Sequence, residues 1–199
     1  MKILLTGPAG FIGSKLLPML LRENHYVIGL DNLTFGYNTL IPYLNNKNFE
    51  FINGDVQEID KHQDIFKNID AIIHLAAIVG FPACKKEPEL AKRVNLEATK
   101  KIADIKNKET ILIYASTCSN YGHRGTDNEC YEDTKLEPLS LYGTTKTESE
   151  EYIRKKNNST ALRIATAFGV SPRLRLDLLV NNFIIDALEN KKIEIFESF

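Results

Sequence analysis

The feature that most restricts the fold of this chain is a regular alternation of short apolar segments with longer helix-like segments. Apolar runs predict six buried strands, at 2–6, 26–30, 49–53, 71–75, 110–115 and 160–165. The segments between and after them predict helices at 11–23, 59–67, 88–106, 140–156 and 178–188. Strands that alternate with helices of this length form a parallel sheet covered on both faces. Right-handed crossovers then favour a doubly wound α/β fold with strand order 3-2-1-4-5-6.

Three further segments complete the predicted map. The polar stretch after the second strand, which contains Gly36 and Pro42, predicts a loop with a short helix. Residues 122–138 are polar without a clear period and predict a loop. Residues 193–196 predict the start of another strand.

A glycine-rich turn joins the first predicted strand to the first helix, with glycines at Gly7, Gly10 and Gly13. Such a turn lets the backbone approach a pyrophosphate, and the helix N-terminus supplies free N–H groups and partial positive charge. The spacing is G-x-x-G-x-x-G, and by itself it is equally compatible with a tight strand-to-helix turn that binds nothing. Its position between strand and helix favours a dinucleotide site.

An acidic residue ends the second predicted strand, at Asp31, eighteen residues after Gly13. A carboxylate there accepts hydrogen bonds from an adenosine ribose and repels a 2′-phosphate. No Arg or Lys occurs between Asp31 and Lys47, so the sequence favours NAD over NADP. The alternative is an acid that only caps a turn.

Two further elements carry groups suited to proton transfer. Tyr142 and Lys146 stand four residues apart, so on a helix they share a face. A nearby ammonium is expected to lower the tyrosine pKa from about 10 and favour the phenolate. Ser116 and Thr117 end the fifth predicted strand, where ligands of doubly wound sheets bind. The alternatives are a solvated helix face for the pair and a turn-capping hydroxyl for Thr117.

Composition excludes several classes of protein. The formal net charge is −1, which rules out electrostatically driven binding to nucleic acid or a membrane surface. No apolar run approaches the roughly 20 residues of a membrane span, and no signal-peptide cleavage pattern follows the first strand. The three cysteines and four histidines match no metal-binding spacing, so we expect reduced thiols, a cytoplasmic location and no metal site.

Taken in order, these motifs resemble those of extended short-chain dehydrogenases/reductases of the nucleotide-sugar epimerase/dehydratase family. The resemblance covers the whole chain and implies a Rossmann fold. It is carried by the TGPAGFIG turn at 6–13, Asp31-Asn32-Leu33, Gly54-Asp55-Val56, His74-Leu75-Ala76-Ala77, Asn95, Ala115-Ser116-Thr117, Tyr121-Gly122 and the Y-x-x-x-K pair.

The resemblance implies a role for each matching residue. The pyrophosphate of NAD is expected at Gly7, Gly10, Phe11, Ile12 and Gly13. The adenosine ribose is expected at Asp31 and Asn32, with the adenine between Asp55 and Val56. Leu75, Ala76 and Ala77 are expected beside the cofactor, supported by Asn95, while Lys146 and Ala165 are expected near the nicotinamide half.

The resemblance also implies a mechanism, in which Tyr142 takes a proton from a sugar hydroxyl and Thr117 hydrogen-bonds the same oxygen. Family members that eliminate water place Asp-Glu after the catalytic Thr, and related decarboxylases keep the Glu. Here Cys118 and Ser119 stand at those positions. Neither residue suits water elimination, so the sequence favours an NAD-dependent epimerase of a nucleotide-diphosphate sugar.

Other possibilities stay open from the sequence. The chain is alternatively an NAD(P)-dependent nucleotide-sugar reductase or dehydratase, or an NAD-binding module without catalysis. Thr166 stands where UDP-galactose epimerases carry Asn, and Asn182 is a candidate ligand of the substrate diphosphate. Arg173 and Arg175 are equally well explained as diphosphate ligands and as surface charges.

The resemblance finally predicts domains and assembly. Residues 1–170 are expected to form the NAD-binding domain, and residues 171–199 the start of a substrate-binding region that continues in longer family members. We expect a homodimer through the helices at 88–106 and 140–156.

Overall fold

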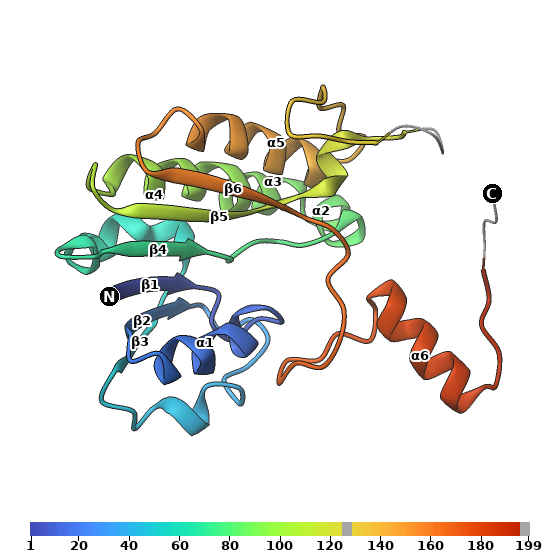
Figure 1. The fold of residues 1–199 in the computed structure, drawn as a ribbon, viewed down its shortest axis with the longest axis horizontal. Helices are drawn as coiled ribbons and strands as arrows, with labels where there is room; N and C mark the ends of the chain where they lie inside the picture. The colour runs from blue at the N-terminus through green and yellow to red at the C-terminus, as the bar shows by residue number, and fades with distance from the viewer. Residues whose placement is uncertain (125–128, 196–199) are drawn as a thin grey trace.

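A six-stranded parallel sheet forms the centre of the computed structural model, which describes residues 1–124 and 129–195 (Figure 1). Its strands are β1 (Lys2–Thr6), β2 (Tyr26–Asp31), β3 (Phe49–Asn53), β4 (Ala71–His74), β5 (Ile111–Thr117) and β6 (Ser159–Ile164). The order β3-β2-β1-β4-β5-β6 is the order predicted from the sequence. All carboxyl ends therefore lie at one edge of the sheet.

Helices cover both faces of the sheet. On one face, α1 (Gly13–Arg22) packs over β1 and β2 through Leu17 and Leu21, with Leu40 beside the 3-10 helix η1 (Ile41–Tyr43) completing this layer. On the other face lie the 3-10 helix η2 (Val56–Phe66), α4 (Ala98–Ile105) and α5 (Leu141–Ile153). The two apolar clusters bury both faces of β1 and β2, which explains why these strands read as unbroken apolar runs.

The predicted helix at 88–106 is one continuous helical segment with a change of pitch in its middle. It consists of α3 (Pro88–Lys92), a π-helical stretch η3 (Arg93–Glu97) and α4. Before it lies a short helix that the sequence does not predict, α2 (Phe81–Lys86), which follows Gly80 at φ +89°. Six residues contain too few turns for a recognisable apolar period.

The remaining predictions have mixed outcomes. The helix predicted at 59–67 is the 3-10 helix η2, and the helix predicted at 178–188 is α6 (Leu179–Glu189), which lies to the side of the sheet (Figure 1). Residues 193–195 form no strand, contrary to the prediction, and Phe196 lies outside the described residues. A 3-10 turn, η4 (Cys118–Tyr121), follows β5, and the described part of the predicted loop at 122–138 contains no helix or strand.

Candidate active site

The glycine turn after β1 is built around two close backbone contacts. Gly7 has φ +74°, and a Cβ added there would lie 3.0 Å from the backbone nitrogen of Ala76. A Cβ on Gly13 would lie 2.0 Å from the carbonyl oxygen of Gly7. Glycine at both positions lets α1 begin directly against the turn, which brings its N-terminus to the carboxyl edge of the sheet. This geometry fits a dinucleotide pyrophosphate.

Gly13→Ala is expected to lower the free energy of unfolding by at least about 2 kcal/mol, because the added methyl group overlaps backbone that cannot move independently. Urea denaturation measures the loss. Lys15→Ala, at an exposed position of the same helix, is the control and is expected to change stability by less than about 0.5 kcal/mol. Equal stabilities for the Gly13 variant and the wild type would contradict this account of the turn.

Asp31 connects the end of β2 to the glycine turn. Its carboxylate accepts hydrogen bonds from the backbone N–H of Ala9 at 3.0 Å and of Leu33 at 2.9 Å. Burial raises the pKa of this carboxyl, and the two backbone N–H groups partly oppose that shift. The Asp31 carboxylate, which is predicted to bind a ribose, is thus held beside the glycine turn. Its oxygens keep lone pairs that can accept further hydrogen bonds.

Asn32 and Asp55, both predicted to lie at the adenosine, are hydrogen-bonded to each other. The Asn32 side-chain amide donates to a carboxylate oxygen of Asp55 at 2.9 Å. The other Asp55 oxygen accepts from the backbone N–H of Gln57 and so caps η2. Val56 is buried in the sheet core, so its side chain acts through packing in this structure.

A buried hydrogen-bond chain holds the segment that follows β4. The hydroxyl of Thr6 accepts from the backbone N–H groups of Leu75 at 3.1 Å and Ala76 at 3.2 Å. It therefore donates its proton to Nδ1 of His74, 2.7 Å away. Nε2 of His74 is 2.9 Å from the hydroxyl of Thr99. Burial lowers the pKa of His74 to about 3, so the ring is neutral and acts as a fixed link.

Asn95 bonds the same segment at Ile78, three residues after Leu75. Its side-chain amide accepts from the backbone N–H of Ile78 at 2.8 Å and donates to the carbonyl of the same residue at 2.9 Å. Asn95 belongs to the π-helical stretch, and its own carbonyl accepts from Thr99 and from Ser149 of α5. This links the segment containing Ala77 to the helix that carries the Tyr/Lys pair.

Thr117 ends β5, and Tyr142 and Lys146 lie in the first turns of α5, which packs against β5. The hydroxyl of Thr117 accepts from the backbone N–H of Ser119 at 3.1 Å. Burial raises the pKa of Tyr142, while the side chain of Thr117 and the charge of Arg175 oppose the shift. The expectation of a lowered tyrosine pKa is therefore wrong, because desolvation outweighs the Thr117 hydrogen bond and the charge of Arg175.

Lys146 is almost completely buried, with 3% of its surface exposed. Its ammonium nitrogen lies 4.4 Å from the centroid of the Tyr114 ring, within cation–π range. Burial lowers its pKa to about 7, partly opposed by Cys84. A buried lysine that titrates near neutrality is typical of functional sites.

A buried ion pair that the sequence does not predict contacts Ser116, the residue before Thr117. Arg163 on β6 donates to the Glu150 carboxylate of α5 at 2.6 Å, and both side chains are less than a tenth exposed. Glu150 also accepts from Ser116 at 2.6 Å and from Asn120 at 3.1 Å. The pair fixes the end of β5 and the turn η4 against α5. The two residues lie on different elements, so no periodic pattern marks them.

The predicted substrate residues are only partly assembled by the described chain. Ala165 and Thr166 directly follow β6 and are exposed at the same edge of the sheet. Asn182 is also exposed, and its amide donates to Asp186 of its own helix at 2.8 Å. These roles stay predictions, as does the pairing of two copies through the helices predicted at 88–106 and 140–156.

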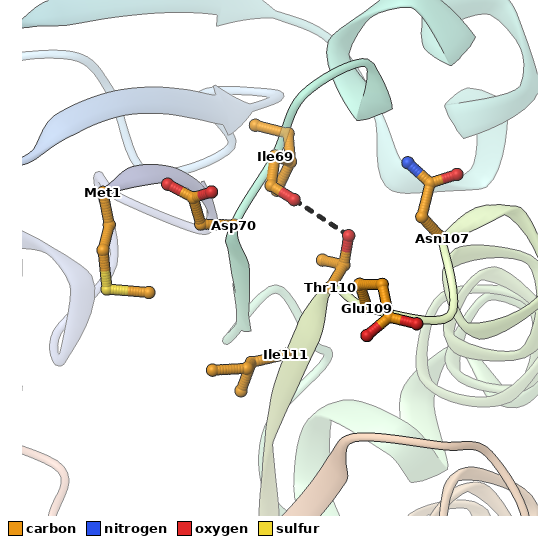
Figure 2. Close-up of a pocket in the computed structure, with 7 residues that line it drawn as sticks. All are labelled: Met1, Ile69, Asp70, Asn107, Glu109, Thr110 and Ile111. Atoms are coloured by element: carbon orange, nitrogen blue, oxygen red, sulfur yellow. Dashed lines mark hydrogen bonds between the residues drawn. The ribbon is translucent and has the colours of Figure 1, made fainter.

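A separate pocket of about 710 Å³ lies at the opposite edge of the sheet, at the amino ends of β1, β4 and β5 (Figure 2). Figure 2 shows the Thr110 hydroxyl donating to the carbonyl of Ile69 within its lining. None of the proton-transfer residues lines it. Within residues 1–124 and 129–195, no cluster of three or more potential metal ligands occurs, and no helix has the length and apolarity needed to traverse a bilayer.

Residues 3–198 match the model of the NAD dependent epimerase/dehydratase family. The chain is 33% identical to an uncharacterized UDP-glucose epimerase of Bacillus subtilis, covering 98% of this chain and 65% of the relative. It is 33% identical to a UDP-glucuronate 4-epimerase of Thermodesulfobacterium geofontis, covering 97% and 64%.

Two solved structures are also similar to this chain. A UDP-glucuronic acid 4-epimerase from Bacillus cereus in complex with NAD superposes with a TM-score of 0.81 at 32% identity, over 96% of this chain and 63% of that one. A dTDP-glucose 4,6-dehydratase from Streptomyces venezuelae, with NAD bound, superposes with a TM-score of 0.83 at 25% identity, over the same shares. The chain thus spans less than two thirds of the length of each of these relatives.

Proposed function

The chain belongs to the NAD dependent epimerase/dehydratase family, and from that premise we propose that it binds NAD and interconverts the C4 epimers of a UDP-sugar. The observation that carries the proposal is the position of Thr117, Tyr142 and the buried Lys146 at the carboxyl end of β5 and the start of α5, on the sheet edge where the glycine turn also begins. The names of the relatives supply the UDP-sugar and the C4 position.

The residues present fit the dinucleotide along its length. Gly7 and Gly13 allow the close backbone contacts that place the N-terminus of α1 directly after β1, and a helix N-terminus at this edge of the sheet suits a pyrophosphate. Asp31 and the Asn32–Asp55 pair offer acceptors for the adenosine half. When bound, NAD supplies the hydride acceptor for a transient oxidation of the sugar and a positive charge that favours the Tyr142 phenolate.

Tyr142 is the proton acceptor in this proposal. As a phenolate it removes the proton of the C4 hydroxyl, and it returns that proton once the keto-sugar presents its other face. Thr117 donates its hydroxyl proton to the same oxygen, while one of its two lone pairs accepts the N–H of Ser119. Lys146, held on the same side of α5, stabilises the phenolate when it is protonated.

The turn after β5 favours epimerisation over water elimination. Cys118 donates to the carbonyl of Arg163 at 3.2 Å, and Ser119 is bonded through its N–H to Thr117. Neither side chain is a carboxylate able to supply the second acid and base of a dehydratase. The likeness to a 4,6-dehydratase structure therefore supports the shared scaffold only.

NAD is expected to bind at least about 100-fold more tightly than NADP, because a 2′-phosphate would be repelled by the half-buried Asp31 carboxylate. Isothermal titration with each dinucleotide checks this. Glu50→Gln is the control, because it removes one exposed carboxylate from β3. It is expected to leave the ratio of the NAD and NADP affinities unchanged. Equal affinities for the two dinucleotides would show that Asp31 does not bind the adenosine ribose.

The function itself is tested by incubating the chain with NAD and, separately, with UDP-glucose, UDP-galactose, UDP-glucuronate and UDP-galacturonate. Chromatography of the nucleotide-sugars is expected to show a C4 epimer of at least one of them, with no net formation of NADH. Stoichiometric NADH would instead identify a dehydrogenase.

A further inference from the structure

The segment that follows β6 returns across the sheet edge and binds the start of α1. The hydroxyl of Ser171 lies 2.6 Å from the carbonyl oxygen of Phe11 in the glycine turn, to which it donates. The hydroxyls of Ser14 and Ser171 are 3.0 Å apart. Since the Ser171 proton is engaged, Ser14 donates to Ser171 and accepts from the backbone N–H of Arg173 at 3.3 Å.

These contacts join residues more than 150 positions apart and are shielded from water. Ser14 is completely buried and Ser171 is 7% exposed. We call residues 171–173 the strap. Its partners, Phe11 and Ser14, belong to the turn and the first residues of α1, where the pyrophosphate is expected.

A second contact carries the strap over the adenosine side. The guanidinium carbon of Arg173 lies 4.3 Å from the centroid of the Phe35 ring, a stacking cation–π arrangement. Phe35 is 67% exposed and stands four residues after Asp31, the predicted ribose ligand. The strap therefore touches elements on both sides of the expected dinucleotide path.

We propose that the strap retains NAD, with Ser171 and Arg173 setting how slowly the dinucleotide leaves. This inference rests on the proposed function, because an epimerase returns the hydride to the same sugar and so has no need to exchange its cofactor. Release would require breaking the buried Ser171–Phe11 and Ser14–Ser171 bonds together with the Arg173–Phe35 stack.

The test measures NAD dissociation by stopped-flow displacement with a fluorescent dinucleotide. Ser171→Ala removes two hydrogen bonds and is expected to speed dissociation by about tenfold. Ser159→Ala is the matched control, because the Ser159 hydroxyl bonds only the nearby carbonyl of Asn157. A structural role alone would lower the melting temperature of the ligand-free chain without changing the dissociation rate.

Phe35→Ala provides a second variant whose folding is not at risk, since the ring is exposed. It is expected to speed dissociation by about threefold, and Arg173→Ala combined with it should add little more, because both remove the same stack. If wild type binds NAD but Ser171→Ala and Phe35→Ala release it at the wild-type rate, the strap proposal fails alone. If wild type binds no NAD, the proposed function fails and the strap proposal fails with it.

Discussion

Replacing Tyr142 with phenylalanine is expected to lower kcat for UDP-sugar epimerisation by about a thousandfold, the loss typical of removing a general acid–base group. The ring is retained, so the packing at the start of α5 and the affinity for NAD should change little. What is lost is the hydroxyl that takes the C4 proton beside Thr117. Steady-state rates with the best UDP-sugar, measured with saturating NAD, give the ratio.

Tyr152→Phe is the matched control for this substitution. Tyr152 lies on the same helix, and its hydroxyl bonds Asp104 at 2.8 Å, away from Thr117. We expect it to keep at least about half of the wild-type kcat. Unchanged turnover in the Tyr142 variant would exclude the proposed proton acceptor.

Lys146→Met is expected to stabilise the fold by the order of 3 kcal/mol at pH 7 while abolishing most of the activity. The pKa of Lys146 falls to about 7 in the folded chain, against a usual value of about 10.5 in the unfolded chain. The folded state thus disfavours the ammonium, and methionine fills the buried space without that cost.

The pH dependence has a definite sign. Between about pH 7 and 10.5 the unfolded chain binds more protons at Lys146 than the folded chain does, so wild-type stability rises with pH across that window. The advantage of Lys146→Met should therefore be largest at and below about pH 7 and shrink toward pH 10. Urea denaturation of both proteins across this range measures the difference, with the exposed Lys155→Met as control. A variant less stable than wild type at every pH would show that the ammonium is stabilised in the fold.

The order of the sheet and the position of the glycine turn were predictable because both depend on local signals. Buried parallel strands produce continuous apolar runs, and Gly7 and Gly13 are required by backbone contacts within the turn and against the adjacent strand. Asp31 and Thr117 were placed by the rule that ligand-binding groups follow the carboxyl ends of strands.

Features that depend on contacts distant in sequence were not predictable. The Glu150–Arg163 pair joins a helix to a strand, and the Ser14–Ser171 contact joins the first helix to the segment after the last strand. The direction of the Tyr142 pKa shift also required the structure, because a Y-x-x-x-K spacing reports the neighbouring charge but not the extent of burial. The prediction of a strand starting at residue 193 was wrong for residues 193–195. A short run that alternates apolar and charged residues does not specify which strand it would pair with.

The central claim is a transient oxidation at C4, and the fate of the hydrogen on that carbon tests it most directly. A UDP-sugar carrying deuterium at C4 is incubated with the chain and NAD in ordinary water, and the epimer is examined by mass spectrometry and NMR. The account predicts that the epimer keeps its deuterium at C4, because the same hydride leaves and returns while Tyr142 handles only the hydroxyl proton. Deuterium lost to solvent, or no epimer from any UDP-sugar, would contradict it.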